Sequence, residues 1–338
     1  RPAIATIFVV HAVLLAWNSY AHSVVTVEVC HLPAGLAHWH FGRFDLFRVN
    51  PPLVRMVASL PVILAQPKYE WREYSLDPLV RSESVVGNDF IRANGSRVVW
   101  LYTLGRWACI PISLIGGYFC YRWAKELYGV LAGFVASAFW CFCPNILGHG
   151  ALIMPDVSAA ALGVAACYTF WRWVKRPRWT NTIAAGLVLG CAELVKTTLV
   201  VFYLLWPILW LVYRLPDRYR MSWGNWGREA TMFIVQMLVC LCVVNLGYGL
   251  EGSFQPLGDY LFQSHMLTGC PYENSNSLGG FVTYPAGNRF AGTWLDRLPV
   301  PWPRNYVQGI DTQKVDFEAG RDSYLGGTWD NHGWWYFY

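Results

Sequence analysis

Charged side chains are scarce in this chain of 338 residues. Asp, Glu, Lys and Arg make up 14% of it and hydrophobic residues 55%, whereas soluble proteins carry about 25% charged residues. This scarcity excludes an ordinary soluble domain and predicts an integral membrane protein. The net charge of +5 is modest, and we expect no nucleic acid among the partners.

The spacing of ligands that a zinc site needs is also lacking. Eight of the ten cysteines lie in apolar runs, where free cysteine packs as a small hydrophobic residue. Two Cys-x-Cys pairs occur, Cys141 with Cys143 and Cys240 with Cys242. Neither has further Cys or His residues nearby at the spacing of a zinc site. We therefore expect that these cysteines bind no metal. The sequence indicates no particular cofactor, and it leaves open whether a divalent ion is used. Cys30 and Cys270 lie in polar segments, where we favour free thiols over a disulfide.

Long apolar runs, in contrast, recur through the first three quarters of the chain. A membrane-spanning helix needs about 20 mostly apolar residues. The sequence predicts an all-α polytopic membrane protein with residues 1–250 as its transmembrane domain. We expect spans near residues 2–20, 98–119, 127–143, 152–171, 182–196, 197–213 and 229–249.

The charge of the connecting segments predicts which face is cytoplasmic. Three of these segments together hold ten Lys or Arg residues against two acids: 122–126, 172–178 and 214–228. Basic loops stay in the cytoplasm. Alternation of the spans then places the first loop 21–97, the turn at Lys196 and the tail 251–338 on the outer face.

The segment 51–66 is ambiguous between a span and a surface helix. Its 16 residues would rise only about 24 Å as a helix, and Arg55 interrupts its apolar run. We favour a helix at the outer interface. The polar loop that follows carries an N-glycosylation triplet at Asn94.

The tail from Glu251 onward has a different composition. It carries nine acids against five bases, and the stretches 283–306 and 323–338 predict loops with short strands. Its Trp and Tyr residues suit either stacking on a sugar or anchoring at a membrane interface. We expect the chain to be cut short at Tyr338, before further spans.

Ionisable residues inside the expected spans are few, and such residues mark functional sites by default. They are Arg106, Asp156, Glu193 and Lys196. Asp156 follows Pro155, so its alternative role is to stabilise the start of a helix. Glu193 and Lys196 are three residues apart and could instead neutralise each other.

Arg106 has no acidic neighbour at helical spacing in its own segment, so its partner must come from elsewhere. A guanidinium group binds phosphate in a bidentate fork. We expect an outward-facing cavity with carboxylates that activate a nucleophile and cations that hold an anionic group. A lipid phosphate suits such a cavity, because its tail stays in the bilayer.

Four motifs follow one another on the predicted outer face. They are VEVCHLPAGL (27–36), NPPL (50–53), PNILGHGALIMPD (144–156) and AELVKTT (192–198). Together with the order of the spans, over about residues 1–250, they resemble glycosyltransferase family 39 of the membrane-embedded GT-C superfamily. This family includes protein O-mannosyltransferases and lipid A aminoarabinose transferases. The resemblance implies a GT-C helical bundle that transfers a sugar from a polyprenyl phosphate to a hydroxyl group with inversion.

The resemblance also implies roles for individual residues. The first-loop motif of the family reads Asp-Glu, with the Asp as base, but Val27 stands at the Asp position here. Glu28 is then the expected general base, and Asp156 orients the acceptor or the sugar. The groups expected to bind substrate, chiefly by stabilising the departing phosphate, are Asn50, Arg106 and Lys196, with His31 as a further hydrogen-bond partner of the site.

Two other functions stay open at this point. Val27 favours a catalytically inactive relative that binds lipid-linked glycan or a partner subunit. A transporter is disfavoured, because the polar residues gather at one face and no internal repeat is found. The expected partners are the bilayer, a polyprenyl-phosphate sugar and a glycan, lipid or protein hydroxyl acceptor. We expect a bacterial inner membrane, with the site facing the non-cytoplasmic side.

Overall fold

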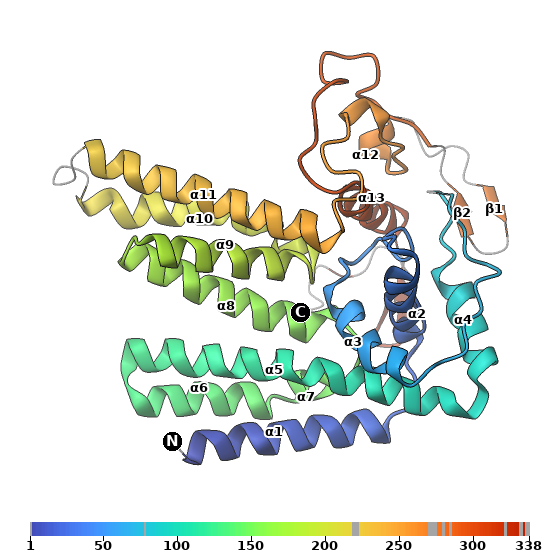
Figure 1. Cartoon of the computed structure of the whole chain (residues 1–338), viewed down its shortest axis with the longest axis horizontal. Coiled ribbons are helices and arrows are strands. Elements are labelled where there is room, and N and C mark those ends of the chain that lie inside the picture. The colour runs from blue at the N-terminus through green and yellow to red at the C-terminus, as the bar shows by residue number, and fades with distance from the viewer. Residues whose placement is uncertain are drawn as a thin grey trace.

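The computed structural model describes residues 2–77, 79–217, 223–269, 276–278, 281–283, 286–320, 323–330 and 334. Most of these residues are helical, and the long helices lie side by side in a bundle (Figure 1). The helices of the bundle coincide with the apolar runs of the sequence: α1 (Pro2–Ala21), α5 (Val98–Tyr128), α6 (Val130–Phe142), α8 (Pro155–Lys175), α9 (Trp179–Glu193), α10 (Val201–Arg214) and α11 (Trp223–Gly247).

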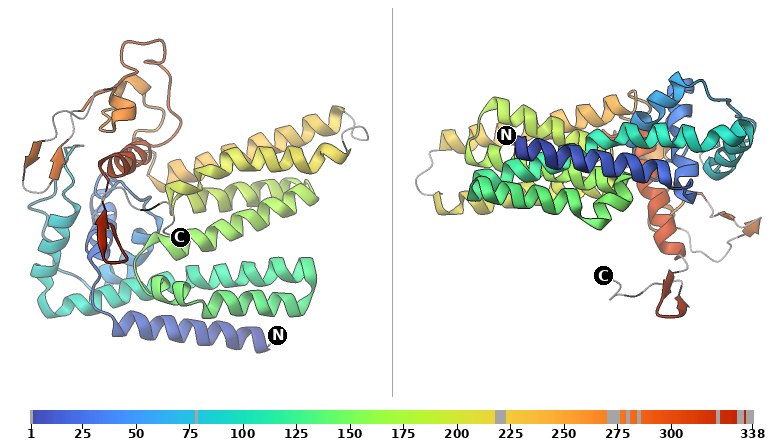
Figure 2. Two further views of the ribbon diagram at one scale, coloured as in Figure 1. Left: turned by 180° about the vertical axis from the view of Figure 1, so that it is seen from behind. Right: turned by 90° about the horizontal axis from the view of Figure 1, so that it is seen from below.

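Shorter elements gather at one end of this bundle. Figure 2 shows from behind that the segments before α5 and after α11 meet there, far apart though they are in the sequence. The helices are α2 (Thr26–Phe41), α3 (Leu53–Leu64), α4 (Glu83–Asn94), α7 (Pro144–Gly150), α12 (His265–Thr268) and α13 (Arg304–Ala319). Single 3-10 turns are η1 (Gly95–Arg97), η2 (Thr197–Val200), η3 (Leu215–Asp217) and η4 (Leu257–Asp259). Two antiparallel hairpins pair β1 (Asn276–Leu278) with β2 (Phe281–Thr283) and β3 (Ser323–Leu325) with β4 (Thr328–Asp330).

Four helical runs among the described residues are long and apolar enough to cross a membrane: Pro2–Ala21, Glu83–Tyr128, Thr197–Arg214 and Trp223–Gly247. A fifth results if α6 and α7, which are bent by 52°, are taken as one span. The chain is thus a multi-pass integral membrane protein. The expected number of seven spans is not reached by these criteria, since α8 does not meet them and α9 has only 15 residues. Both helices nevertheless pack within the bundle, α8 against α5 and α9 against α11.

Small residues set the distance between α9 and α11. A Cβ atom at Gly186 would lie 2.5 Å from the backbone oxygen of Gln236, and one at Gly190 would lie 2.5 Å from the Cβ of Val243. Two glycines four residues apart let neighbouring helices approach closely inside a membrane. The sequence of α9 therefore fixes how tightly α11 packs on it.

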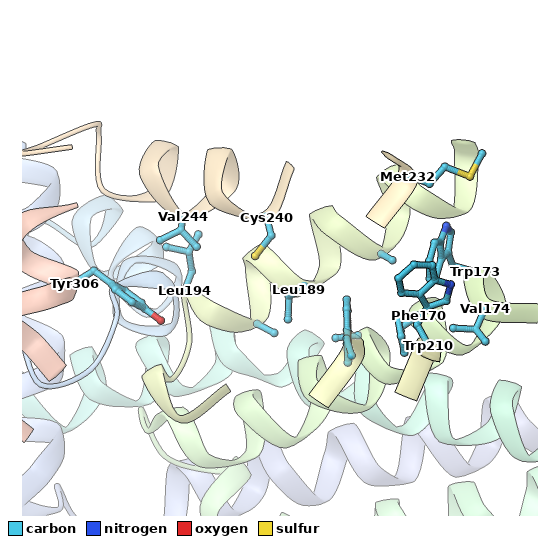
Figure 3. Packing of buried hydrophobic residues seen from close by; sticks show 14 of the residues in the cluster. Phe170, Trp173, Val174, Leu189, Leu194, Trp210, Met232, Cys240, Val244 and Tyr306 are labelled. Atoms are coloured by element: carbon cyan, nitrogen blue, oxygen red, sulfur yellow. The ribbon is translucent and has the colours of Figure 1, made fainter. Parts of the chain in front are cut away.

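The largest hydrophobic core runs along α8 to α11. Trp206 stacks on Phe170 with 4.4 Å between ring centroids, and Trp210 stacks on Phe233 at 5.8 Å. Figure 3 shows the core continuing past Leu189 to Leu194, Val244 and Tyr306. Because Tyr306 belongs to α13, the core of the bundle extends into the elements that cover its end.

The segment 21–97, predicted as the first loop, contains the three helices α2, α3 and α4. The sequence analysis expected only the second of them. α2 and α4 are partly polar, while α3 is the segment predicted to lie at the membrane surface. α3 has 12 residues, too few to cross a bilayer, and it packs against α2 and α5. Its position at the membrane interface stays a prediction.

Two features outside the bundle bear on the sequence analysis. The folded chain does not present the N-glycosylation triplet, because Asn94 is buried and donates its amide to the carbonyls of Lys68 and Phe90. The tail also contains α13, which follows directly on Pro303 and lies almost entirely between the two stretches predicted as loops with short strands. The β3–β4 hairpin does match the strands predicted there, and Cys270 lies outside the described residues.

Candidate functional site

A buried ion pair between Glu28 and Arg106 stands at the covered end of the bundle. Neither side chain has exposed surface. Arg106 donates from Nη2 to Oε2 at 2.5 Å and from Nε to Oε1 at 2.9 Å. Its other N–H groups donate to the carbonyls of Ser19, His22 and Ser23. Every N–H of the guanidinium group is thus used, and none is left for the phosphate that the sequence analysis assigned to it.

The Glu28 carboxylate is equally occupied. Besides Arg106, it accepts from the backbone N–H of Ile153 at 2.8 Å and of Val25 at 3.1 Å. Glu28 lies in the first turn of α2, where the sequence analysis assumed a loop. Its predicted role as general base gains no support from this geometry, because its oxygens face the protein interior. The neighbouring Val27 points outward, with 40% of its surface exposed.

A second ion pair, between Asp156 and Lys196, is open to its surroundings. Lys196 Nζ lies 2.7 Å from Asp156 Oδ1, and the side chains are 39% exposed for Asp156 and 29% for Lys196. Asp156 lies in the first turn of α8, directly after Pro155 at the helix start. Lys196 follows the end of α9 and does not pair with Glu193, so the local neutralisation considered above does not hold. This pair combines a proton acceptor with a cation that a substrate can reach.

Backbone contacts bring the two ion pairs and the NPPL motif to the same end of the bundle. Glu28 holds Ile153, three residues before Asp156. The N–H of Leu53 donates to the carbonyl of Leu194 at 3.0 Å, two residues before Lys196. The half-buried Asn50 therefore approaches the same region.

His31 lies elsewhere in this end of the chain, on the buried face of α2. Its ring meets Phe47 edge-on at 4.7 Å between centroids, and neither ring nitrogen has a hydrogen-bond partner in the described part of the chain. Burial, and then the charge of Arg55, lower the pKa of His31 well below its ordinary value. The imidazole is therefore neutral near pH 7. His31 does not contact Glu28 in any hydrogen bond described.

Glu193, the remaining ionisable residue of the spans, is tied to α13. Its carboxylate accepts a hydrogen bond from the Tyr306 hydroxyl, and close by Thr197 Oγ1 donates to Gln313 Oε1 at 2.9 Å. Burial, followed by the nearby Glu193, raises the pKa of Tyr306, so its hydroxyl stays protonated and can donate. Glu193 thus anchors the tail on the bundle.

The described residues contain no group of three or more His, Cys, Asp or Glu side chains placed to hold a metal ion.

Part of the chain matches a known protein family. Residues 103–246 match the model of the dolichyl-phosphate-mannose-protein mannosyltransferase family. This match confirms the resemblance drawn from the motifs. Comparisons with curated proteins and with solved structures found no match.

The matched segment contains Arg106, Asp156 and Lys196, whereas Glu28 and Asn50 come from the segment before it. Sequence reasoning missed one further cation, Arg55 of α3, which is only 1% exposed. The available signal was a single charge inside an apolar helix. We treated it as an interruption of that helix and not as a buried functional group.

Proposed function

We propose that this protein is a membrane glycosyltransferase that moves a sugar from a polyprenyl phosphate to a hydroxyl acceptor. The family of residues 103–246 is one of transferases that use lipid-phosphate sugars. The observation that carries the proposal is the open Asp156–Lys196 pair. The start of α8 and the end of α9, next to which these two residues lie, are at the covered end of the bundle, away from the α5–α6 and α8–α9 turns (Figure 1). By the charge rule those turns face the cytoplasm, so the site faces the other side.

In this proposal Asp156 is the general base. Its carboxylate takes the proton of the acceptor hydroxyl while the hydroxyl oxygen forms a bond to the anomeric carbon. The bond between that carbon and the phosphate oxygen breaks, and its electron pair leaves with the lipid phosphate. Lys196 stabilises the charge that develops on the phosphate. A single displacement of this kind inverts the anomeric configuration.

In this scheme Glu28 and Arg106 do not contact the substrate but hold other parts of the site in place. Their ion pair joins the end of α1, the start of α2, the first third of α5 and the loop before α8 through hydrogen bonds. The N–H of Ile153 is part of that network, so the pair holds the loop that leads to Asp156. Asn50 remains the proposed neutral hydrogen-bond donor to the phosphate.

A second function is favoured by Val27. This exposed residue stands where the resembled family has its catalytic Asp, and the adjacent Glu28 is fully buried. A protein with this arrangement could bind the lipid-linked sugar or a partner subunit without turnover. The two functions make opposite predictions for the variant Val27→Asp.

The test is release of lipid phosphate from a labelled polyprenyl-phosphate sugar by the purified full chain. We expect wild-type turnover, a loss of about 10²- to 10⁴-fold in Asp156→Asn and a clear loss in Lys196→Gln. Asp89→Asn is the matched control, because Asp89 also pairs with a cation, Arg92, at 3.4 Å. Equal turnover by wild type and Asp156→Asn would overturn the assignment. Turnover only after Val27→Asp would establish the second function.

A further inference from the structure

A buried cation without an anion lies between α2 and α3. Arg55 is 1% exposed and donates from Nη2 to the carbonyl of Asn50. Its Nε and Nη1 have no hydrogen-bond partner in the described residues, and no carboxylate described there forms a salt bridge with it. The guanidinium lies 5.4 Å from the centroid of the Phe47 ring. Burial lowers the pKa of Arg55 to about 10, so the group is still charged at neutral pH.

Two neutral histidines share this buried region. His31 and His38 are each 2% exposed and lie seven residues apart, on the same face of α2. Gly35 lies between them on that face, and a Cβ atom there would stand 2.1 Å from the carbonyl oxygen of Arg55. This close contact is between the backbones of α2 and α3. The side chains of His31 and Arg55 share a neighbour, because the centroid of the Phe47 ring lies 4.7 Å from that of the His31 ring and 5.4 Å from the Arg55 guanidinium.

The ring nitrogens of these histidines are largely unused. His31 has no partner at either nitrogen and His38 none at Nε2 within the described residues, while His38 Nδ1 lies 2.7 Å from the carbonyl oxygen of Arg43. Burial and the charge of Arg55 lower the pKa of both histidines. Neutral His38 therefore has its proton on Nδ1 and none on Nε2. The donors without an acceptor are the Nε and Nη1 groups of Arg55 and the single N–H of neutral His31.

The other groups that act on Arg55 do not neutralise it. Glu83, Tyr248 and Cys30 influence its charge electrostatically, but the Glu83 carboxylate is paired with Arg81 at 2.9 Å. A buried charge that lacks a counter-ion and has partners for only some of its N–H groups is strongly unfavourable. An oxyanion would satisfy all of these needs together, since it supplies negative charge and several acceptor atoms.

We propose that Arg55, together with His31, forms an internal oxyanion site that takes a phosphate group. Arg106 was assigned this role from sequence, but it has no N–H left, whereas Arg55 has two nitrogens without a partner. The carbonyl of Asn50 holds Arg55, and the motif of Asn50 is bonded to the chain next to Lys196. The choice of a lipid phosphate as the physiological source rests on the proposed function, and free phosphate is the alternative source.

The test measures binding without any sugar donor. The purified full chain is titrated with inorganic phosphate in one arm and with polyprenyl phosphate in nanodiscs in the other, and thermal unfolding is followed. We expect the unfolding temperature to rise with at least one phosphate source in wild type. Arg92→Gln, which removes an exposed arginine, keeps this rise. In Arg55→Gln the affinity falls at least tenfold.

A second measurement covers the case in which Arg55→Gln does not fold. Sulfate keeps a constant charge between about pH 5 and pH 8, the range in which histidine titrates. A bound anion favours the protonated imidazole, so wild-type affinity for sulfate rises severalfold as pH falls across this range. In His31→Gln, which has no group to protonate at that position, the rise is smaller.

Three results would overturn the inference: no stabilisation of wild type by either phosphate source, undiminished binding in Arg55→Gln, or sulfate affinity that does not change with pH. These are distinct from failure of the proposed function. Binding of lipid phosphate that depends on Arg55, without any sugar transfer, leaves this site standing and removes the transferase. Transfer with an unchanged KM in Arg55→Gln would support the transferase and count against this phosphate site.

Discussion

Replacing Glu28 by Gln tests whether the buried ion pair is structural. The change keeps the size of the side chain but leaves the Arg106 guanidinium buried without a counter-charge. It also weakens two charge-assisted hydrogen bonds, at 2.5 and 2.9 Å. Removing one partner of a buried pair costs about 3–5 kcal/mol. We therefore expect Glu28→Gln to lower the free energy of unfolding by about that amount.

The assay is reversible denaturation in mixed micelles, with Arg92→Gln as the control. The Arg92 side chain is 80% exposed in its pair with Asp89, and surface ion pairs contribute only about 0.2–1 kcal/mol. The double variant Glu28→Gln with Arg106→Met removes both charges and should recover part of the lost stability. Recovery is incomplete, because carbonyl acceptors such as that of Ser19 lose their donor. Unchanged stability in Glu28→Gln, with activity lost, would refute the structural role and restore Glu28 as a catalytic candidate.

Three further outcomes are expected. Gly35→Ala should destabilise the fold by about 1–3 kcal/mol in denaturation experiments, because the new Cβ would lie 2.1 Å from a backbone oxygen of α3. The control Gly148→Ala should leave stability nearly unchanged, because a Cβ there has no atom within 4 Å. Tyr306→Phe removes the hydrogen bond to Glu193 and should cost about 1–3 kcal/mol, seen as faster proteolysis of α13; unchanged cleavage would count against that anchor. Burial lowers the pKa of His31 in the folded chain, so the unfolded chain binds more protons below the ordinary value of 6.5. The stability contributed by the neutral ring is complete above that pH and is lost as pH falls below it; a flat profile in wild type would contradict this.

The bundle could be predicted from the sequence because each of its helices lies in an apolar run. Outside the bundle α3 was also predicted as a helix, but α2 and α13 were not, since they are mixed in polarity. α2 is stabilised by what it packs against, for example the close approach of Gly35 to α3. α13 begins after a proline-rich stretch that reads as a loop, and its place on the bundle depends on the contact between Tyr306 and Glu193.

The sequence predicted which residues belong to the candidate site but not which of them form ion pairs. Charged residues inside apolar segments identified Arg106, Asp156 and Lys196. Their partners could not be assigned, because Glu28 precedes Arg106 by 78 residues and Asp156 precedes Lys196 by 40, far beyond helical spacing. A sequence pattern also cannot tell which of two carboxylates is buried, and here that difference moves the proposed base from Glu28 to Asp156.

The most direct test of the proposed reaction is a single-turnover transfer followed by NMR of the anomeric carbon. The full chain is mixed with a polyprenyl phosphate that carries a sugar labelled with ¹³C at the anomeric position, together with a hydroxyl acceptor. The account predicts a product of inverted configuration, formed by wild type and by Asp89→Asn but about 10²- to 10⁴-fold more slowly by Asp156→Asn. A product of retained configuration, or full speed in Asp156→Asn, would contradict it.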